Sequence, residues 1–267
     1  AAAALARRGL GARIRLVYTV HGFHGLAQPG PLGLRVRLER ALARSVDATA
    51  FVSAADAALA RDAGLRHRGP AEVIENGLPG PAVPPDAPRD IDVLFVGRLV
   101  YQKNPQAFVD ACAALDRLRP GARLRMVGAG ELAAEVDARA AAAGLADFQR
   151  IDGLPHDETL ALMARARLLA MTSRWEGLPT VAIEAALHGA PAAGFAIPPL
   201  AEALGDAADA LLTPPDPDAL AARLAALLGD APRRDALARA VNAHAAERYA
   251  PARMARRYAA LYAAAAA

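Results

Sequence analysis

The sequence predicts an α/β protein made of parallel strands joined by helices. Short runs of β-branched and other apolar residues alternate along the chain with longer stretches that have the period of amphipathic helices. Parallel strands need a crossover connection, usually a helix, so this alternation favours parallel sheets covered by helices. One stretch, residues 77–90, interrupts the alternation and is dense in proline and glycine, as interdomain linkers are. We therefore expect two domains.

The strands and helices are expected in the following order. Three strands precede the linker, at 13–20, 48–52 and 71–76, with a helix at 32–46 between the first two. Six strands follow it, at 92–97, 123–128, 147–152, 166–172, 191–196 and 210–214, and the chain closes with helices at 217–229, 232–247 and 251–265. Six strands are enough for a doubly wound sheet, whereas three are few for a domain of this class.

The predicted domains follow from this count. Residues 1–87 are expected to form a partial N-terminal Rossmann-like domain, residues 88–247 a C-terminal Rossmann-like domain, and residues 248–267 a helix returning towards the first domain. The chain begins without methionine and has no glycine-rich turn before residue 13, so we expect the front of the N-terminal domain to be missing.

The composition excludes several classes of protein. With 54% hydrophobic and 22% charged residues, the chain is typical of globular proteins, and it has no run of about 18 uncharged apolar residues that could span a membrane. The N-terminal stretch has no signal-peptide core, so a cytoplasmic location is expected. Cys112 is the only cysteine, so an intrachain disulfide is impossible and a core position is expected. The net charge of +3 suits an anionic ligand or an acidic membrane but selects neither.

A basic pair follows the first strand after the linker, in FVGRLVYQKN (95–104). The strand is expected to end at Gly97, Arg98 follows it, and Lys103 is the only lysine of the chain. In open α/β sheets ligands bind beyond the carboxyl ends of strands, so both cations are placed to offset the charge of a pyrophosphate. Exposed loop cations are the alternative interpretation.

Two glutamates flank a Gly-Leu-Pro turn in EGLPTVAIEA (176–185). Pro179 suits the start of a helix, expected over residues 180–188. Thr180 and Glu184 then share one face and lie about 6 Å apart along the axis, roughly the span from a phosphate to its ribose. Free amides at the helix start would bind a diphosphate, and the Glu184 carboxylate could accept both hydroxyls of a ribose cis-diol. A solvated helix surface is the alternative.

Together these stretches resemble the C-terminal half of retaining glycosyltransferases of family 4, which have the GT-B fold of two Rossmann-like domains facing across a cleft. The resemblance is carried by GRLVYQKN (97–104), VGAGE (127–131), the Glu-x7-Glu stretch and PPDPDALAARLAALL (214–228). The first half is similar to the later part of the N-terminal domain in bacterial members that build capsule or exopolysaccharide, through YTVHGFHG (18–25), LERALARSVDATAFVSAADAAL (38–59) and VIENGLP (73–79).

The resemblance implies a role for each matching residue. Arg98 and Lys103 match the diphosphate-binding pair, Glu184 the ribose-binding glutamate and Glu176 the glutamate that faces donor-sugar hydroxyls. His21 matches a histidine that reaches the donor sugar, with His24 as the weaker candidate. The catalytic candidates are His21, Glu176, Arg98 and Lys103. The other expected donor contacts, many through the backbone, are Gly97, Gly128, Gly130, Ile151, Gly177, Leu178, Thr180 and Val181.

The implied reaction transfers a sugar from a nucleotide sugar, UDP- or GDP-linked, to an acceptor hydroxyl with retention of configuration. The acceptor would be a carbohydrate or a lipid-linked saccharide. No cofactor or metal is expected, because cations and a helix N-terminus can stabilise the departing nucleoside diphosphate. No nucleic-acid partner is expected. Arg37, Arg40 and Arg44 share one face of the helix at 32–46 and allow a peripheral membrane contact, with a solvated face as the alternative.

Two other functions are weighed against this one. GAGELA (128–133) fits the Gly-x-Gly-x-x-Ala pattern of dinucleotide-binding oxidoreductases, with Asp147 nineteen residues after Gly128, but it leaves Lys103 and both glutamates unexplained. A non-catalytic nucleotide-sugar-binding partner of a complete transferase is the second alternative. One departure from the family is AIPPLAEALGD (196–206), where Pro198 and Pro199 replace a glycine-rich loop and have no backbone N–H to donate.

Overall fold

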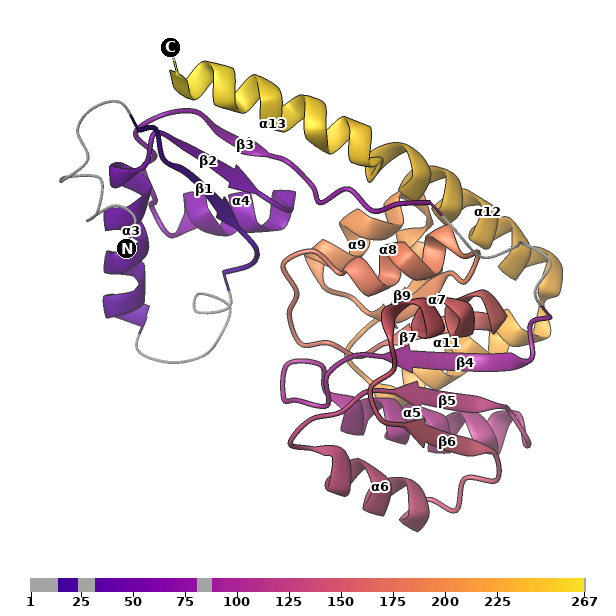
Figure 1. The fold of residues 1–267 in the computed structure, drawn as a ribbon. Helices are drawn as coiled ribbons and strands as arrows, with labels where there is room; N and C mark the ends of the chain where they lie inside the picture. Colours follow the sequence, from indigo (N-terminus) through magenta and orange to yellow (C-terminus); the bar gives the residue numbers. More distant parts are fainter. Residues whose placement is uncertain (1–13, 24–31, 81–87, 267) are drawn as a thin grey trace. The chain divides into compact units, whose positions relative to one another are not determined.

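The structure, a computed structural model, describes residues 14–23, 32–80 and 88–266. The chain divides into two compact units, each with a parallel sheet and helices (Figure 1). Unit 1 takes the described residues within 1–77, 176–178 and 248–267, and unit 2 takes those within 78–175 and 179–247. The predicted α/β class with parallel sheets is confirmed.

Unit 1 contains a three-stranded parallel sheet in the order β1-β2-β3. Its elements are β1 (Val17–Val20), α3 (Leu32–Ser45), β2 (Ala48–Phe51), α4 (Ala54–Asp62), β3 (Ala71–Val73) and α13 (Pro251–Ala266). Alternate side chains of a strand point to opposite faces of the sheet, and the core divides accordingly. Phe51 packs with Val20 and Phe23 in one cluster, whereas Ala48 and Ala50 pack against α13 in another.

Helix α13 is attached to its sheet by apolar and ionic contacts. Leu261 of α13 is fully buried in the cluster that contains Ala48 and Ala50. The buried Glu75 carboxylate lies 3.5 Å from a nitrogen of Arg257, in α13, and 2.8 Å from a nitrogen of Arg248, which precedes that helix. A buried carboxylate requires such partners, because an unpaired charge in the interior is costly. The C-terminal helix is therefore part of the core of unit 1.

Unit 2 contains a six-stranded parallel sheet in the order β6-β5-β4-β7-β8-β9. The strands are β4 (Ile91–Val96), β5 (Leu124–Val127), β6 (Phe148–Ile151), β7 (Ala166–Met171), β8 (Ala192–Phe195) and β9 (Leu212–Thr213). The order reverses between β4 and β7, where the chain moves from one side of β4 to the other. Such a switch point leaves a crevice at the carboxyl ends of the strands, which is where ligands bind in open sheets.

The helices of unit 2 form a layer on each face of this sheet. The first layer holds α5 (Pro105–Leu118), α6 (Ala133–Ala142) and α11 (Pro217–Gly229), since α5 packs against both of the others. The second holds α7 (His156–Arg165), α8 (Thr180–Leu187) and α9 (Pro198–Leu204), where α8 packs against both of the others. The chain also forms η1 (Gly205–Ala207), α10 (Ala208–Leu211) and α12 (Ala231–Arg248).

The predicted helices and strands are confirmed, although most strands are shorter than predicted. The last strand is the clearest correction: residues 210–211 belong to helix α10, so β9 has only two residues. Cys112 is fully buried in α5, and burial raises the pKa of its thiol well above the ordinary value. Among the described residues, no helix is both long and apolar enough to cross a membrane.

Candidate functional site

Two loops of unit 2 meet at the switch point of the sheet. The loop after β4 carries Arg98 and Lys103, and the loop after β7 leads to Thr180 and Val181 at the start of α8. Because β4 and β7 are adjacent parallel strands, their carboxyl ends lie at the same edge. The structure thus brings together the predicted basic pair and the predicted helix N-terminus.

Hydrogen bonds join the two loops directly. The Arg174 N–H donates to the Gln102 carbonyl over 2.8 Å, and the Gln102 side-chain amide donates to the Trp175 carbonyl over 3.0 Å. The Thr172 hydroxyl, fully buried at the end of β7, donates to the Lys103 carbonyl over 3.1 Å. The backbone of Lys103 is therefore held by the neighbouring strand. Sequence reasoning missed Thr172 and Gln102.

Asn104 shapes the end of the loop that carries Lys103. With φ of 51°, it is the only non-glycine residue of the described chain with a left-handed backbone, a conformation that asparagine tolerates better than most residues. Its side-chain oxygen accepts a hydrogen bond from Arg174 over 3.1 Å, and the Arg174 guanidinium lies 4.4 Å from the centroid of the Tyr101 ring. Pro105 then begins α5. Strained backbone of this kind gathers at binding sites.

The glycines after β5 permit a close approach of backbones. A Cβ on Gly128 would lie 1.9 Å from the Gly97 carbonyl oxygen, and one on Gly130 would lie 2.4 Å from the Leu99 oxygen. Both positions must be glycine for the loops after β4 and β5 to pack together. The Gly128 N–H also donates to the Ile151 carbonyl over 3.0 Å. The predicted residues Gly97, Gly128, Gly130 and Ile151 therefore all lie at the carboxyl ends of β4, β5 and β6.

Helix α8 begins with backbone amides that have no helical partner. The N–H groups of Ala182 and Ile183 donate to the Pro179 carbonyl, and Pro179 provides no side-chain cap. In a helix the first N–H groups lie beyond the reach of any intrahelical acceptor, so those of Thr180 and Val181 have no acceptor within α8. Such an N-terminus favours anions.

Glu184 lies one turn into α8 and is half-buried. Its side chain is 17% exposed, and one carboxylate oxygen lies 3.8 Å from the His156 Nε2 at the start of α7. Burial raises the pKa of Glu184 above the ordinary value, and the charge of His156 opposes this shift. His156 was missed by sequence reasoning, since only the packing of α7 on α8 brings the two residues together.

The far end of α8 is held by residues distant in the sequence. The Asn242 side-chain amide of α12 donates to the carbonyls of Ala186 and Leu187, each over 3.0 Å, and Arg89 donates to the His188 carbonyl over 3.1 Å. The last carbonyls of a helix require such partners. Both contacts anchor the helix that carries Glu184.

His21 and residues 176–178 belong to unit 1. His21 is exposed and directly follows β1. Gly177 packs closely within the same unit, where a Cβ would lie 2.7 Å from the His21 carbonyl oxygen. Glu176 is half-buried and Leu178 is buried. The weaker candidate, His24, lies outside the described residues.

Comparison with known families identifies the chain. The model of the family described as "Glycosyl transferases group 1" matches residues 81–244. The chain belongs to this family. The match includes the predicted donor-site residues from Gly97 to Glu184.

This group 1 chain is similar in sequence to named bacterial proteins. It is 35% identical over 122 residues to the 2-deoxystreptamine glucosyltransferase of Streptomyces kanamyceticus, covering 45% of the chain and 32% of that protein. It is 34% identical over 179 residues to a glycogen synthase of Mycobacterium tuberculosis, covering 64% and 42% respectively. The chain thus spans less than half the length of these curated relatives.

Solved structures share the fold of this group 1 member. Anabaena Alr3699/HepE, solved in complex with UDP, superposes with a TM-score of 0.83 at 22% identity, over 98% of this chain and 75% of that one. Staphylococcus aureus TarM superposes with a TM-score of 0.76 at 13% identity, over 93% and 50%. The neighbours are GT-B glycosyltransferases, so the predicted fold class is confirmed.

The structure argues against a dinucleotide site of the oxidoreductase type. Such a site needs its acidic residue near the carboxyl ends of the strands. Asp147 instead precedes β6, at the amino end of that strand, where it pairs with Arg125 at 2.7 Å. Gly128 follows the carboxyl end of β5. The two therefore lie at opposite edges of the sheet.

Proposed function

We propose that this chain holds the nucleotide-sugar site of a retaining glycosyltransferase of family 4, acting in bacterial cell-surface polysaccharide or glycolipid synthesis. The observation that carries the proposal is the pair of joined loops at the switch point of unit 2, with α8 opening from one of them. Relatives named for amylovoran biosynthesis in Erwinia amylovora and Vi polysaccharide biosynthesis in Salmonella typhi support the setting.

Each group of the site then has one task. Arg98 and Lys103 would offset the charge of a diphosphate, while the amides of Thr180 and Val181 would donate to its oxygens. Ionised Glu184 would accept hydrogen bonds from the two ribose hydroxyls, because a carboxylate is an acceptor only. A UDP- or GDP-linked sugar fits this set, and UDP is supported by its presence in the structure of the HepE neighbour.

The transfer follows from stabilising the departing diphosphate. As the bond between the anomeric carbon and the phosphate oxygen breaks, negative charge grows on that oxygen, next to the cations and the start of α8. The acceptor oxygen bonds to the anomeric carbon on the face that the phosphate leaves, and the hydroxyl proton passes to the phosphate. Glu176 and His21 would position the donor sugar. No metal or cofactor is required in this scheme.

Nucleotide binding tests the proposal. UDP or GDP should raise the melting temperature of the chain, and NAD should not. Comparing the shifts produced by UDP, GDP and ADP shows which base the site prefers. A ligand at 100 times its dissociation constant adds about 2.7 kcal/mol of stability, enough for a clear shift. Glu184→Ala should weaken binding about tenfold or more, as expected for lost hydrogen bonds to a charged group, whereas Glu247→Ala, an exposed change in α12, should not.

Two results would contradict the proposal. If no nucleoside diphosphate shifts the melting temperature, the proposal of a nucleotide site is wrong. If Glu184→Ala binds nucleotide as tightly as the wild type, Glu184 does not bind the ribose. Transfer activity separates an enzyme from a non-catalytic binding partner. The assay follows sugar release from the preferred nucleotide sugar, with and without a saccharide or lipid-linked acceptor.

A further inference from the structure

Unit 2 has a cleft of about 640 Å³ that the proposed reaction does not use. It lies at the carboxyl ends of β7, β8 and β9, and it is lined by residues that end or follow these strands, by Asn104 just before α5, and by residues of α5, α6 and α11. A volume of this size is typical of small-molecule sites. Its polar lining consists of Asn104, Gln106, Asp110, Glu135, Arg139, Ser173 and Arg174.

The cleft is distinct from the proposed nucleotide-sugar site. The three helices that line it form one layer of unit 2, whereas α8, with Thr180, Val181 and Glu184, belongs to the other layer. None of the residues assigned above to the donor lines the cleft. The two sites are neighbours through both loops: Asn104 follows Lys103 in the chain, and Ser173 and Arg174, which also line the cleft, belong to the loop that leads to α8.

The charges of the cleft cancel. Arg139 and Arg174 supply two positive charges, and Asp110 and Glu135 supply two negative ones. A phosphate or another anion would meet two carboxylates, and a metal cation would meet two guanidinium groups, so neither kind of ion is favoured. A neutral ligand suits this balance.

The side chains are arranged in pairs on rigid helices. Arg139 of α6 donates two hydrogen bonds to the Asp110 carboxylate of α5, over 2.6 and 2.9 Å, and Gln106 donates to Glu135 over 3.3 Å. A guanidinium has five N–H groups and a carboxylate about four acceptor positions, so each pair can still bond to a ligand. Paired side chains are already ordered, which lowers the entropy cost of binding.

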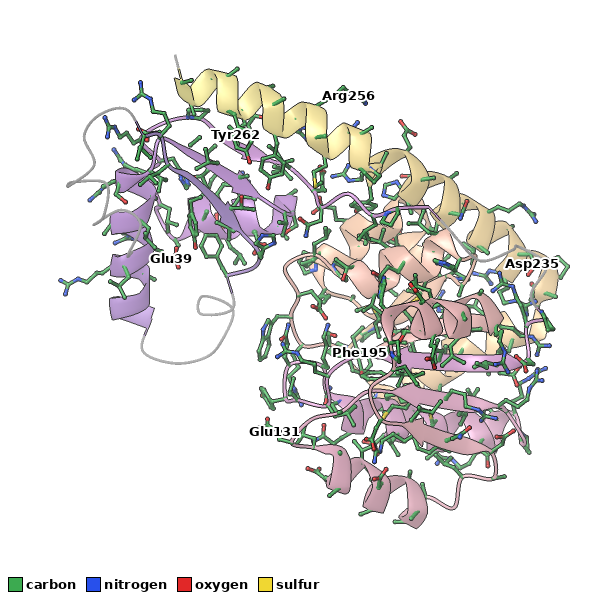
Figure 2. All side chains as sticks on the ribbon, viewed as in Figure 1. Glu39, Glu131, Phe195, Asp235, Arg256 and Tyr262 are labelled. Atoms are coloured by element: carbon green, nitrogen blue, oxygen red, sulfur yellow. The ribbon has the colours of Figure 1, made fainter. Side chains whose placement is uncertain are left out.

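Apolar groups form the rest of the wall. Phe195, labelled in Figure 2, is buried at the end of β8, while Ile197, Pro215 and Pro217 are partly or fully exposed. A pyranose ring offers hydroxyls that both donate and accept, together with an apolar C–H face. The cleft offers hydrogen-bond donors and acceptors for the hydroxyls of such a ring and apolar side chains for its C–H face.

We infer that this cleft is a second binding site for a neutral saccharide, separate from the nucleotide-sugar site. A saccharide held there would bond to the Arg139–Asp110 and Gln106–Glu135 pairs and pack on Ile197 and the two prolines. The inference does not depend on the proposed transferase reaction, because it rests on other residues.

Saturation-transfer NMR with neutral oligosaccharides tests the site. The probes are maltotriose, N,N'-diacetylchitobiose and sucrose, with inorganic phosphate as the anionic comparison. At least one saccharide should bind the full chain. Ala196→Trp, which places a large side chain on an exposed lining position, should abolish that binding, and Arg139→Ala should weaken it about tenfold.

Matched variants separate this site from the donor site. Arg117→Ala removes another exposed ion-paired arginine, on α5 and outside the cleft, and should leave saccharide binding unchanged. Glu184→Ala should also leave it unchanged, while Ala196→Trp should keep wild-type binding of UDP or GDP. The inference is overturned if none of the saccharides binds, if binding survives Ala196→Trp, or if phosphate competes for the same cleft.

Discussion

At the scale of single residues, Glu184 makes the proposed site sensitive to pH. Its pKa is raised by burial, so the folded protein protonates this carboxyl at a higher pH than the unfolded chain does. The contribution of Glu184 to stability is therefore present below the unfolded pKa and lost as pH rises through the folded one. Nucleotide binding should have the opposite pH dependence, because the ionised Glu184 carboxylate accepts hydrogen bonds from the ribose hydroxyls.

We predict that affinity for UDP or GDP increases as pH rises through the raised pKa of Glu184. Glu184→Gln should remove this component, and His156→Gln should move it to higher pH, since the charge of His156 favours the ionised carboxylate. Titration calorimetry from about pH 4.5 to 8 measures the nucleotide affinity of each variant and of the wild type. Comparing the two at the same pH cancels the effect of the nucleotide's own ionisation. If nucleotide affinity changes with pH in the same way for the wild type and Glu184→Gln, ionised Glu184 does not bind the ribose.

The Thr172 hydroxyl gives a second test at the residue scale. Thr172→Val removes the hydrogen bonds that hold the Lys103 and Asn104 carbonyls, so it should cost about 1–3 kcal/mol of stability and weaken nucleotide binding several-fold. Thr213→Val is the matched control, because it removes a hydroxyl-to-carbonyl bond in β9, away from this loop. Chemical denaturation and nucleotide titration measure the two effects. Equal nucleotide binding by both variants would contradict the positioning of Lys103 by Thr172.

At the scale of elements, α8 depends on α12 for its C-terminal hydrogen bonds. Asn242→Ala should leave the carbonyls of Ala186 and Leu187 without these donors, costing about 1–2 kcal/mol and raising the dissociation constant for nucleotide. Arg239→Ala, on an exposed position of the same helix, is the control. Amide exchange should quicken in α8 for the first variant alone. If α8 is equally protected in both, Asn242 does not anchor it.

At the scale of the whole molecule, the charges of the two units differ in sign. By sequence, the segments of unit 1 contain fifteen arginines and seven carboxylates, whereas those of unit 2 contain sixteen basic residues and twenty-one carboxylates. Exposed Arg37 and Arg44 of α3 contribute to the basic unit, while Arg40 donates to the Ala63 carbonyl. This asymmetry supports the proposal of a peripheral contact between unit 1 and anionic membranes.

We expect the chain to sediment with vesicles that contain anionic lipid and not with neutral ones, and to be released as salt shortens the Debye length. The double variant Arg37→Glu and Arg44→Glu should reduce retention more than Arg117→Glu with Arg233→Glu, which changes as much charge in unit 2. Equal retention by neutral and anionic vesicles would end the membrane proposal.

Much of the fold could be predicted because its signals are local. The spacing of apolar runs located all nine strands found within the described residues. Pro179 and Gly189 marked the bounds of α8, which ends before the left-handed Gly189. The last strand was predicted to start too early, since "ALLTP" has the composition of a strand while residues 208–211 form a helical turn. Composition alone does not separate a short strand from such a turn.

The fold class, the order of the elements and the stretches of the proposed donor site could all be predicted from the amino-acid sequence. These depend on periodicity and on residues adjacent in the chain. Only the tertiary structure showed the contact of His156 with Glu184, the support of Lys103 by Thr172, the anchoring of α8 by Asn242 and the neutral cleft beside α5 and α6. Each of these joins residues from different elements, and their proximity arises from packing that no local pattern records.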